Sequence, residues 1–149
     1  MIAVVQRVTS AKVEVAGQIV GEIGHGLAVL LSVHRDDTSE DVAWMAGKLT
    51  SLRIFRKGEK HFDSDVKEAA GGILLVSNFT VSAATKRGRR PSFDAAAGGE
   101  KGQPLFDAVV AAVQAAGLPV ATGRFGADML VTLSNDGPAT FILDSRAAD

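Results

Sequence analysis

Hydroxyl and amide side chains follow the apolar run at residues 73–76, near the middle of the chain. The polar stretch reads Ser77, Asn78, Phe79, Thr80 and Val81. Polar groups at the end of a buried strand need hydrogen-bond partners, and backbone N–H groups there can face a ligand. Thr80 has no neighbouring base, and an unassisted threonine hydroxyl is a weak nucleophile. Taken alone, Thr80 is therefore interpreted as a β-branched strand residue rather than a nucleophile.

A second candidate segment is Asn135-Asp136-Gly137-Pro138, which combines four residue types that favour turns. On their own these residues predict a hairpin turn between strands at 129–133 and 140–143. Glycine before proline is sterically permissive, so the Gly137–Pro138 bond is open to either isomer. Only about 5–6% of X–Pro bonds are cis, and the residue pattern does not decide between the two.

Basic residues form a third candidate, in a turn-rich loop at residues 85–93. They are Lys86, Arg87, Arg89 and Arg90. Such charges can contact phosphates, whereas a charge run of this kind is also common on plain solvated surface. The formal net charge is −1, so a nucleic-acid partner would have to be bound through a local basic patch.

The side-chain groupings of common enzymes are missing from this sequence. The lack of cysteine excludes a disulfide scaffold, a thiolate nucleophile and a cysteine-based zinc site. His25, His34 and His61 are scattered and lack metal-ligand spacing. There is no GxSxG elbow and no P-loop. We therefore expect no metal and no cofactor.

Length and composition are those of one ordinary soluble domain, over residues 1–149. The chain is 46% hydrophobic and 22% charged, which is close to the average for globular proteins. The N-terminus carries Arg7 and has no long apolar run, so it does not resemble a signal peptide. No stretch approaches the roughly 20 apolar residues that span a bilayer. The expected location is the cytoplasm.

Apolar patterning predicts many strands and two substantial helices. Thr38 and Asp41 resemble a capping box, and the helix they open places an apolar face inward. That face consists of Val42, Met45, Ala46 and Leu49. A second helix is expected to begin at Pro104, after a Gly- and Ala-rich surface stretch, and to end at Gly117. Its inward residues would be Leu105, Val109, Ala112 and Val113.

The strands are expected at residues 2–8, 13–15, 19–23, 27–33, 52–55, 73–76 with an extension toward Val81, 120–122, 129–133 and 140–143. Residues 56–70 read as a loop or a weak hairpin. The connections are mostly of hairpin length and show no βαβ rhythm. This pattern predicts the α+β class with a largely antiparallel or mixed sheet.

The chain as a whole resembles the D-aminoacyl-tRNA deacylase family, through segments whose order and spacing are shared. These segments are residues 3–8, 20–24, 52–55, 88–93, 122–129 and 135–140. The resemblance implies a barrel-like single domain that forms a homodimer. It also implies hydrolysis of the ester between a D-amino acid, or wrongly attached glycine, and the 3′-terminal adenosine of tRNA.

The resemblance also implies a mechanism without a catalytic triad. The ribose 2′-hydroxyl of the substrate would assist hydrolysis, and backbone N–H groups would stabilise charge on the ester oxygen. A Gly137–cis-Pro138 wedge would enter the partner subunit's pocket and exclude L side chains. The active sites would then lie at the subunit interface.

Residue by residue, the site assignments fall into four groups. The catalytic group is Ser77, Asn78, Phe79 and Thr80, and the chirality filter is Gly137 and Pro138. Supporting pocket residues are Arg7, Val81, Asn135 and Thr140, with Arg7 holding the wedge. The basic residues Lys86, Arg87, Arg89 and Arg90 would contact tRNA.

Three features depart from the family pattern. Asn78 stands where the family usually has glutamine, and Val81 stands where leucine is commoner. Residues 60–64 lack an expected Met-Asn pair. Two other functions stay open: a related deacylase that acts on L-alanyl esters, and a non-catalytic binding or oligomer-forming module.

Overall fold

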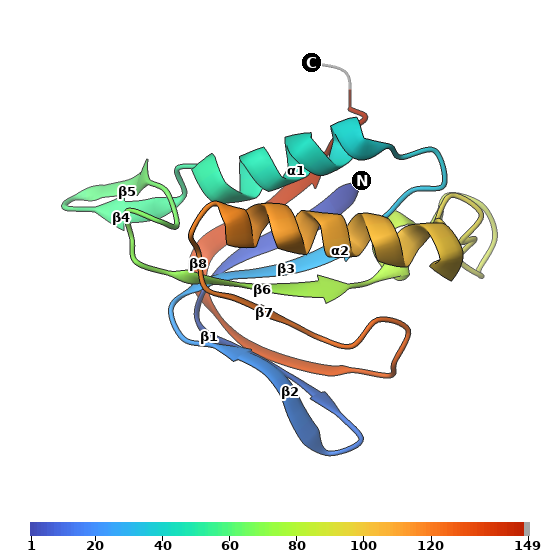
Figure 1. Cartoon of the computed structure of the whole chain (residues 1–149), viewed down its shortest axis with the longest axis horizontal. Coiled ribbons are helices and arrows are strands. Elements are labelled where there is room, and N and C mark those ends of the chain that lie inside the picture. The colour runs from blue at the N-terminus through green and yellow to red at the C-terminus, as the bar shows by residue number, and fades with distance from the viewer. Residues whose placement is uncertain (148–149) are drawn as a thin grey trace.

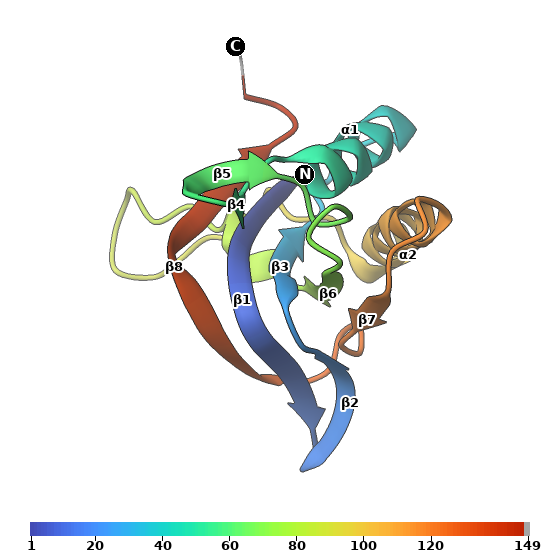
Figure 2. The same ribbon diagram turned by 90° about the vertical axis from the view of Figure 1, so that its left-hand side faces the viewer.

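The computed structural model describes residues 1–147, and a strongly curved sheet carries two helices on one face (Figures 1 and 2). The elements in order are β1 (Ile2–Val15), β2 (Gln18–Ile23), β3 (Gly26–Ser32), α1 (Ser39–Ser51), β4 (Phe55–Lys57), β5 (Lys60–Ser64), β6 (Gly72–Ser77), the 3₁₀ helix η1 (Phe79–Ser82), α2 (Gly99–Ala115), β7 (Val120–Thr122) and β8 (Leu130–Asp144).

β1 is the central strand of the main sheet. It pairs antiparallel with β8 along nearly its whole length on one edge, and with β3 and then β2 on the other. The sheet curls until β2 approaches β7, where a β-carbon added to Gly21 would overlap the Thr122 carbonyl oxygen. Glycine at position 21 thus permits the close approach that makes the sheet barrel-like, as expected.

Parallel pairs complete the sheet, since β6 lies between β3 and β7 and runs parallel to both. The connection from β3 to β6 contains α1, and the connection from β6 to β7 contains α2. The predicted α+β class with a mixed sheet is confirmed, but the expected absence of a βαβ rhythm is wrong. The β4–β5 hairpin and the basic loop lengthen these crossovers and hide the alternation in the sequence.

Helix α1 matches its prediction closely. Thr38 is the N-cap, its side chain accepts from Glu40 N–H, and Asp41 accepts from the Thr38 backbone. Burial raises the pKa of the Asp41 carboxyl, but hydrogen bonds from Ser145 and Thr38 outweigh this, so the net pKa is lowered. The predicted apolar face is buried against the sheet: Val42, Met45, Ala46 and Leu49.

Helix α2 begins at Gly99, earlier than the expected start at Pro104. The Gly98 carbonyl accepts from the N–H groups of Lys101 and Gly102, so the glycines form the first turn rather than a surface loop. Pro104 lies inside the helix, where it removes one hydrogen bond. The buried face is Gly102, Phe106, Val109 and Val113, so Val109 and Val113 were predicted and Phe106 was missed.

Several strand boundaries also differ from expectation. The segments 2–8 and 13–15 are one strand, β1, because β8 pairs along both of them. The strand expected at 52–55 begins only at Phe55, where the weak hairpin β4–β5 forms. β6 ends at Ser77 and does not continue toward Val81, since residues 79–82 turn into η1.

Candidate active site

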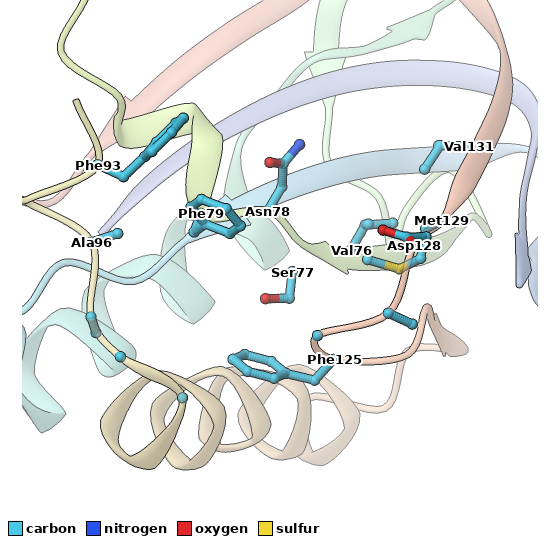
Figure 3. Close-up of a pocket in the computed structure, with 15 residues that line it drawn as sticks. Val76, Ser77, Asn78, Phe79, Phe93, Ala96, Phe125, Asp128, Met129 and Val131 are labelled. Atoms are coloured by element: carbon cyan, nitrogen blue, oxygen red, sulfur yellow. The ribbon is translucent and has the colours of Figure 1, made fainter. Parts of the chain in front are cut away.

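A cavity of about 520 Å³ opens at the end of β6 (Figure 3). This volume lies within the usual range for small-molecule sites. Ser77 points toward its middle, between Phe79 and Phe125 (Figure 3). The walls come from three separate parts of the chain: residues 76–79, residues 93 and 96–99, and residues 125–129 with Val131.

The turn at Asn78 explains why the strand stops there. The Asn78 N–H donates to the Leu31 carbonyl at 2.9 Å, which is the last bond to β3. Its side-chain Oδ1 then accepts from the Thr80 N–H at 3.1 Å and from the Thr80 hydroxyl. Asn78 is thus the N-cap of η1, and this cap directs the chain away from the sheet.

The same contacts limit what Thr80 can do. Its hydroxyl proton is donated to an amide oxygen, which is not a base that could activate a nucleophile. Its backbone N–H is also occupied by Asn78. Among the described residues no acceptor is recorded for the Phe79 N–H. Phe79 therefore offers one backbone donor at the cavity.

Aromatic rings and one acid define the chemistry of the cavity walls. Phe79 and Phe93 pack edge to face, with their ring centroids 5.2 Å apart. Phe125 lines the opposite side, and Asp128 is the one charged residue of the lining. This combination suits a ligand that has a planar ring and hydrogen-bond donors. Ser77, Asn78 and Phe79 were predicted here from the sequence, whereas Phe93, Phe125 and Asp128 were not.

The segment at residues 135–140 is a bulge within β8, and the predicted hairpin turn is wrong. From the pair Gln6–Thr140 to the pair Val8–Asn135, β1 advances two residues while β8 advances five. The surplus residues bulge out of a strand that remains paired on both sides of them. The Gly137–Pro138 peptide bond at its tip is cis.

Hydrogen bonds from β1 and from the bulge itself hold this segment. Asn135 Nδ2 donates to the carbonyls of Arg7 and Ala139, at 3.0 and 3.2 Å. Gln6 Nε2 donates to Thr140 Oγ1 at 3.0 Å. A β-carbon added to Gly137 would lie 3.1 Å from Asn135 Oδ1, so even alanine would press on this network.

Arg7 is the buried centre of the bulge, with 1% of its surface exposed. Its Nε lies 3.1 Å from the Asp136 carbonyl oxygen and 3.0 Å from Asp136 Oδ2. Its Nη1 donates to the carbonyls of Ile54 and His61, and the Phe62 ring covers the guanidinium. Arg7 and Asn135 therefore bind the residues on either side of the Gly137–Pro138 bond.

The cavity and the bulge lie apart within one chain. Ser77 is in register with Leu31, which pairs with Ala3, whereas the bulge surrounds Arg7, four residues further along β1. Four residues of strand correspond to about 13 Å. No residue of the segment 135–140 is among those that line the cavity. Thr80 and Val81 likewise lie in η1, beyond the lining residues.

The predicted basic loop is exposed and adjoins the cavity. A bridge between Ala84 and Ser92 closes the loop, and the next residue, Phe93, is a wall of the cavity. The four basic side chains are Lys86, Arg87, Arg89 and Arg90.

The three histidines take part in separate local contacts. His25 packs against Phe55, His34 lies beside Asp36, and His61 contacts Arg56. Within residues 1–147 no three His, Asp or Glu side chains converge as a metal site requires. In the same part of the chain, no helix has the length and apolar character needed to cross a membrane.

Known proteins similar to this chain span its whole length. The profile of a family described as D-Tyr-tRNA(Tyr) deacylase matches residues 4–144. A D-aminoacyl-tRNA deacylase from Opitutus terrae is 51% identical over 150 aligned positions, which cover all of both chains. A protein of the same name from Geobacter sulfurreducens is 50% identical and covers 99% of this chain and 97% of the relative.

Solved structures share the fold. A protein described as c-Myc DNA Unwinding Element Binding Protein superposes with a TM-score of 0.92 at 36% identity, covering 99% of this chain and all of the other. A probable eukaryotic D-amino acid tRNA deacylase gives 0.82 at 20% identity, covering 95% and 97%, and shows the fold alone. With a profile match over residues 4–144 and full-length relatives at half identity, this chain belongs to the D-Tyr-tRNA(Tyr) deacylase family.

Proposed function

We propose that this protein hydrolyses the ester bond of D-aminoacyl-tRNA and of mischarged glycyl-tRNA, releasing tRNA and the free amino acid. Full-length similarity to relatives named D-aminoacyl-tRNA deacylase, at 51% and 50% identity, carries the proposal. Aminoacyl-tRNA is the substrate of cytoplasmic protein synthesis, so the proposed place of action is the cytoplasm.

The cavity is the proposed site of the aminoacylated end of tRNA. The walls formed by Phe79, Phe93 and Phe125 suit the adenine base, and Ser77 lies where the ester would sit. The Phe79 N–H donates to the ester oxygen as negative charge develops there. One such positioned donor is worth about 3–4 kcal/mol of barrier. The ribose 2′-hydroxyl of the substrate then assists the attack, so no side-chain nucleophile is needed.

The bulge is the proposed chirality filter, and it acts in the cavity of a second copy. It lies apart from the cavity of its own chain, so a homodimer is required to bring the two together. Ile142, two residues beyond Thr140 on the same strand, exposes 73% of its surface and offers an apolar contact for such a partner. A fixed backbone wedge excludes an L side chain by collision, while glycine has no side chain to exclude.

The basic loop is the proposed contact for the tRNA phosphates. Because the loop leads directly into Phe93, phosphates bound there would lie beside the end of the acceptor strand. Such contacts depend on salt, so binding should weaken as ionic strength rises.

The decisive experiment compares hydrolysis of D-tyrosyl-tRNA and L-tyrosyl-tRNA by the wild type and by Gly137→Ala. We expect rapid D-only hydrolysis by the wild type, and relaxed selectivity or lost activity in the variant, because the new methyl group displaces Asn135. Gly47→Ala is the matched control, since its β-carbon would meet nothing within 4 Å. Faster hydrolysis of L-alanyl esters would favour the related deacylase, and no hydrolysis at any concentration would favour a non-catalytic module.

A further inference from the structure

The β4–β5 hairpin reaches the bulge through Arg56, a side chain that has no role in the proposed function above. Its Nη2 donates to the Gly137 carbonyl oxygen at 3.4 Å and lies 3.8 Å from Asp136 Oδ1. Arg56 extends from β4, and Lys57 next to it is paired elsewhere, with Glu68 at 3.9 Å. Arg56 is therefore the residue of this strand that contacts the tip of the bulge.

Arg56 and Arg7 contact different parts of the bulge. The Asp136 carboxylate lies between the two arginines, with Oδ2 toward buried Arg7 and Oδ1 toward Arg56. Arg7 also binds the Asp136 carbonyl, whereas Arg56 binds the carbonyl one residue further on, at Gly137. The Gly137 carbonyl belongs to the peptide unit that joins Gly137 to Pro138. Arg56 thus contacts the part of the bulge that Arg7 does not reach.

His61 holds Arg56 in this orientation from the opposite strand of the hairpin. Its Nδ1 lies 2.6 Å from Arg56 Nη1. An arginine can only donate hydrogen bonds, so His61 Nδ1 is the acceptor in this pair. The His61 carbonyl in turn accepts from Arg7 Nη1, so both arginines are tied to the same residue of β5. This arrangement joins the hairpin and the bulge into one unit.

We propose that Arg56 is a positioning residue for the Gly137 carbonyl and sets how strictly the protein rejects L substrates. The inference rests on the proposed function, in which this backbone excludes an L side chain. A carbonyl that can tilt away leaves more room for that side chain, so discrimination falls before D hydrolysis does. Because Arg56 is 44% exposed and the bond is long, its effect is modest compared with that of Arg7.

The test measures single-turnover hydrolysis of D-tyrosyl-tRNA and L-tyrosyl-tRNA by the full-length protein and three variants. Arg56→Met should lower the D-to-L rate ratio about three- to tenfold, through faster L hydrolysis, with the D rate within about twofold. Arg56→Lys keeps the charge but not the fork of donors, so it should restore part of the ratio. Lys57→Met, on the same strand but paired away from the bulge, should leave the ratio unchanged.

Three outcomes overturn the inference. An unchanged ratio in Arg56→Met removes the positioning role, and an equal fall in Lys57→Met makes the effect one of charge alone. Equal slowing of both enantiomers with weaker tRNA binding would make Arg56 a tRNA contact instead. A wild type that hydrolyses neither ester overturns the proposed function as well. An active, selective wild type with an unaffected Arg56→Met variant overturns this inference only.

Discussion

The cavity at the end of β6 and the bulge of β8 are built in opposite ways. The cavity is lined mostly by exposed or half-buried residues, among them Phe79 and Phe93, and its polar side chains come from Ser77 and Asn78 at the end of β6 and from Asp128 in a separate segment. The bulge is joined to β1 and to the β4–β5 hairpin, and Arg7 at its centre is almost fully buried. The cavity walls are thus largely open to solvent, whereas the bulge is anchored by a buried arginine.

This contrast matches the two tasks in the proposed function. A site that accepts many amino acids on a common tRNA end benefits from walls that adapt to each side chain. A group that rejects an enantiomer by collision must stay in place, because a shift of about 1 Å would admit the wrong substrate. At the bulge, the hydrogen bonds of the buried Arg7 side chain supply this restraint.

The largest expected effect comes from removing the centre of the bulge. Arg7→Met removes the buried partner of the Asp136 carboxylate and the Arg7 donor to the carbonyls of Ile54 and His61. We expect the free energy of unfolding to fall by about 3 kcal/mol and the D-to-L rate ratio to collapse. Urea denaturation and the two hydrolysis rates measure both effects.

Arg35→Met, which removes an arginine that is 64% exposed, is the control and should change neither quantity. If Arg7→Met retained both stability and selectivity, the bulge would not depend on its buried cation, and the contrast with the cavity would be lost.

At the cavity we expect a smaller effect, which lowers the hydrolysis rates and leaves the D-to-L ratio unchanged. Asn78→Ala removes the N-cap of η1, which should cost about 1 kcal/mol of stability. The Phe79 N–H would lose its fixed direction, so both hydrolysis rates should fall several-fold while the D-to-L ratio stays constant. Asn78→Gln keeps the amide, so its stability and hydrolysis rates should lie between those of the wild type and of Asn78→Ala. A changed ratio in either variant would mean that the cavity also judges chirality.

Local signals in the sequence were sufficient where the neighbouring residues decide the structure. The Thr38 capping box and the apolar face of α1 are of this kind, and so is the buried run that becomes β6. Arg7 also left a signal, since it continues the inward-facing alternation of Ala3 and Val5 and a buried arginine needs partners. Family resemblance, not this alternation, supplied its role.

Glycine and proline misled where tertiary contacts override their local preference. Residues 135–138 favour a turn in isolation, but pairing with β1 on both sides keeps them in one strand. Gly98 and Gly99 suggested a loop, yet they begin α2. The cavity walls could not be predicted for a different reason. Phe93 and Phe125 are brought to Ser77 only by the sheet order, and no spacing in the sequence records that order.

The smallest effect is expected at Thr80, and it separates the backbone mechanism from a nucleophilic one. Thr80→Ala removes a hydroxyl whose proton is donated to Asn78 Oδ1, and it leaves the backbone N–H in place. We expect the D rate to stay within about threefold and the D-to-L ratio to be unchanged. Loss of a true nucleophile costs on the order of 10⁶ in rate, so the two mechanisms differ by several decades.

Thr80→Ser is the matched control because it retains the hydroxyl, and its D rate should equal that of the wild type. A fall beyond about a thousandfold in Thr80→Ala, restored in Thr80→Ser, would assign the chemistry to the side chain. The cavity would then be as strictly arranged as the bulge.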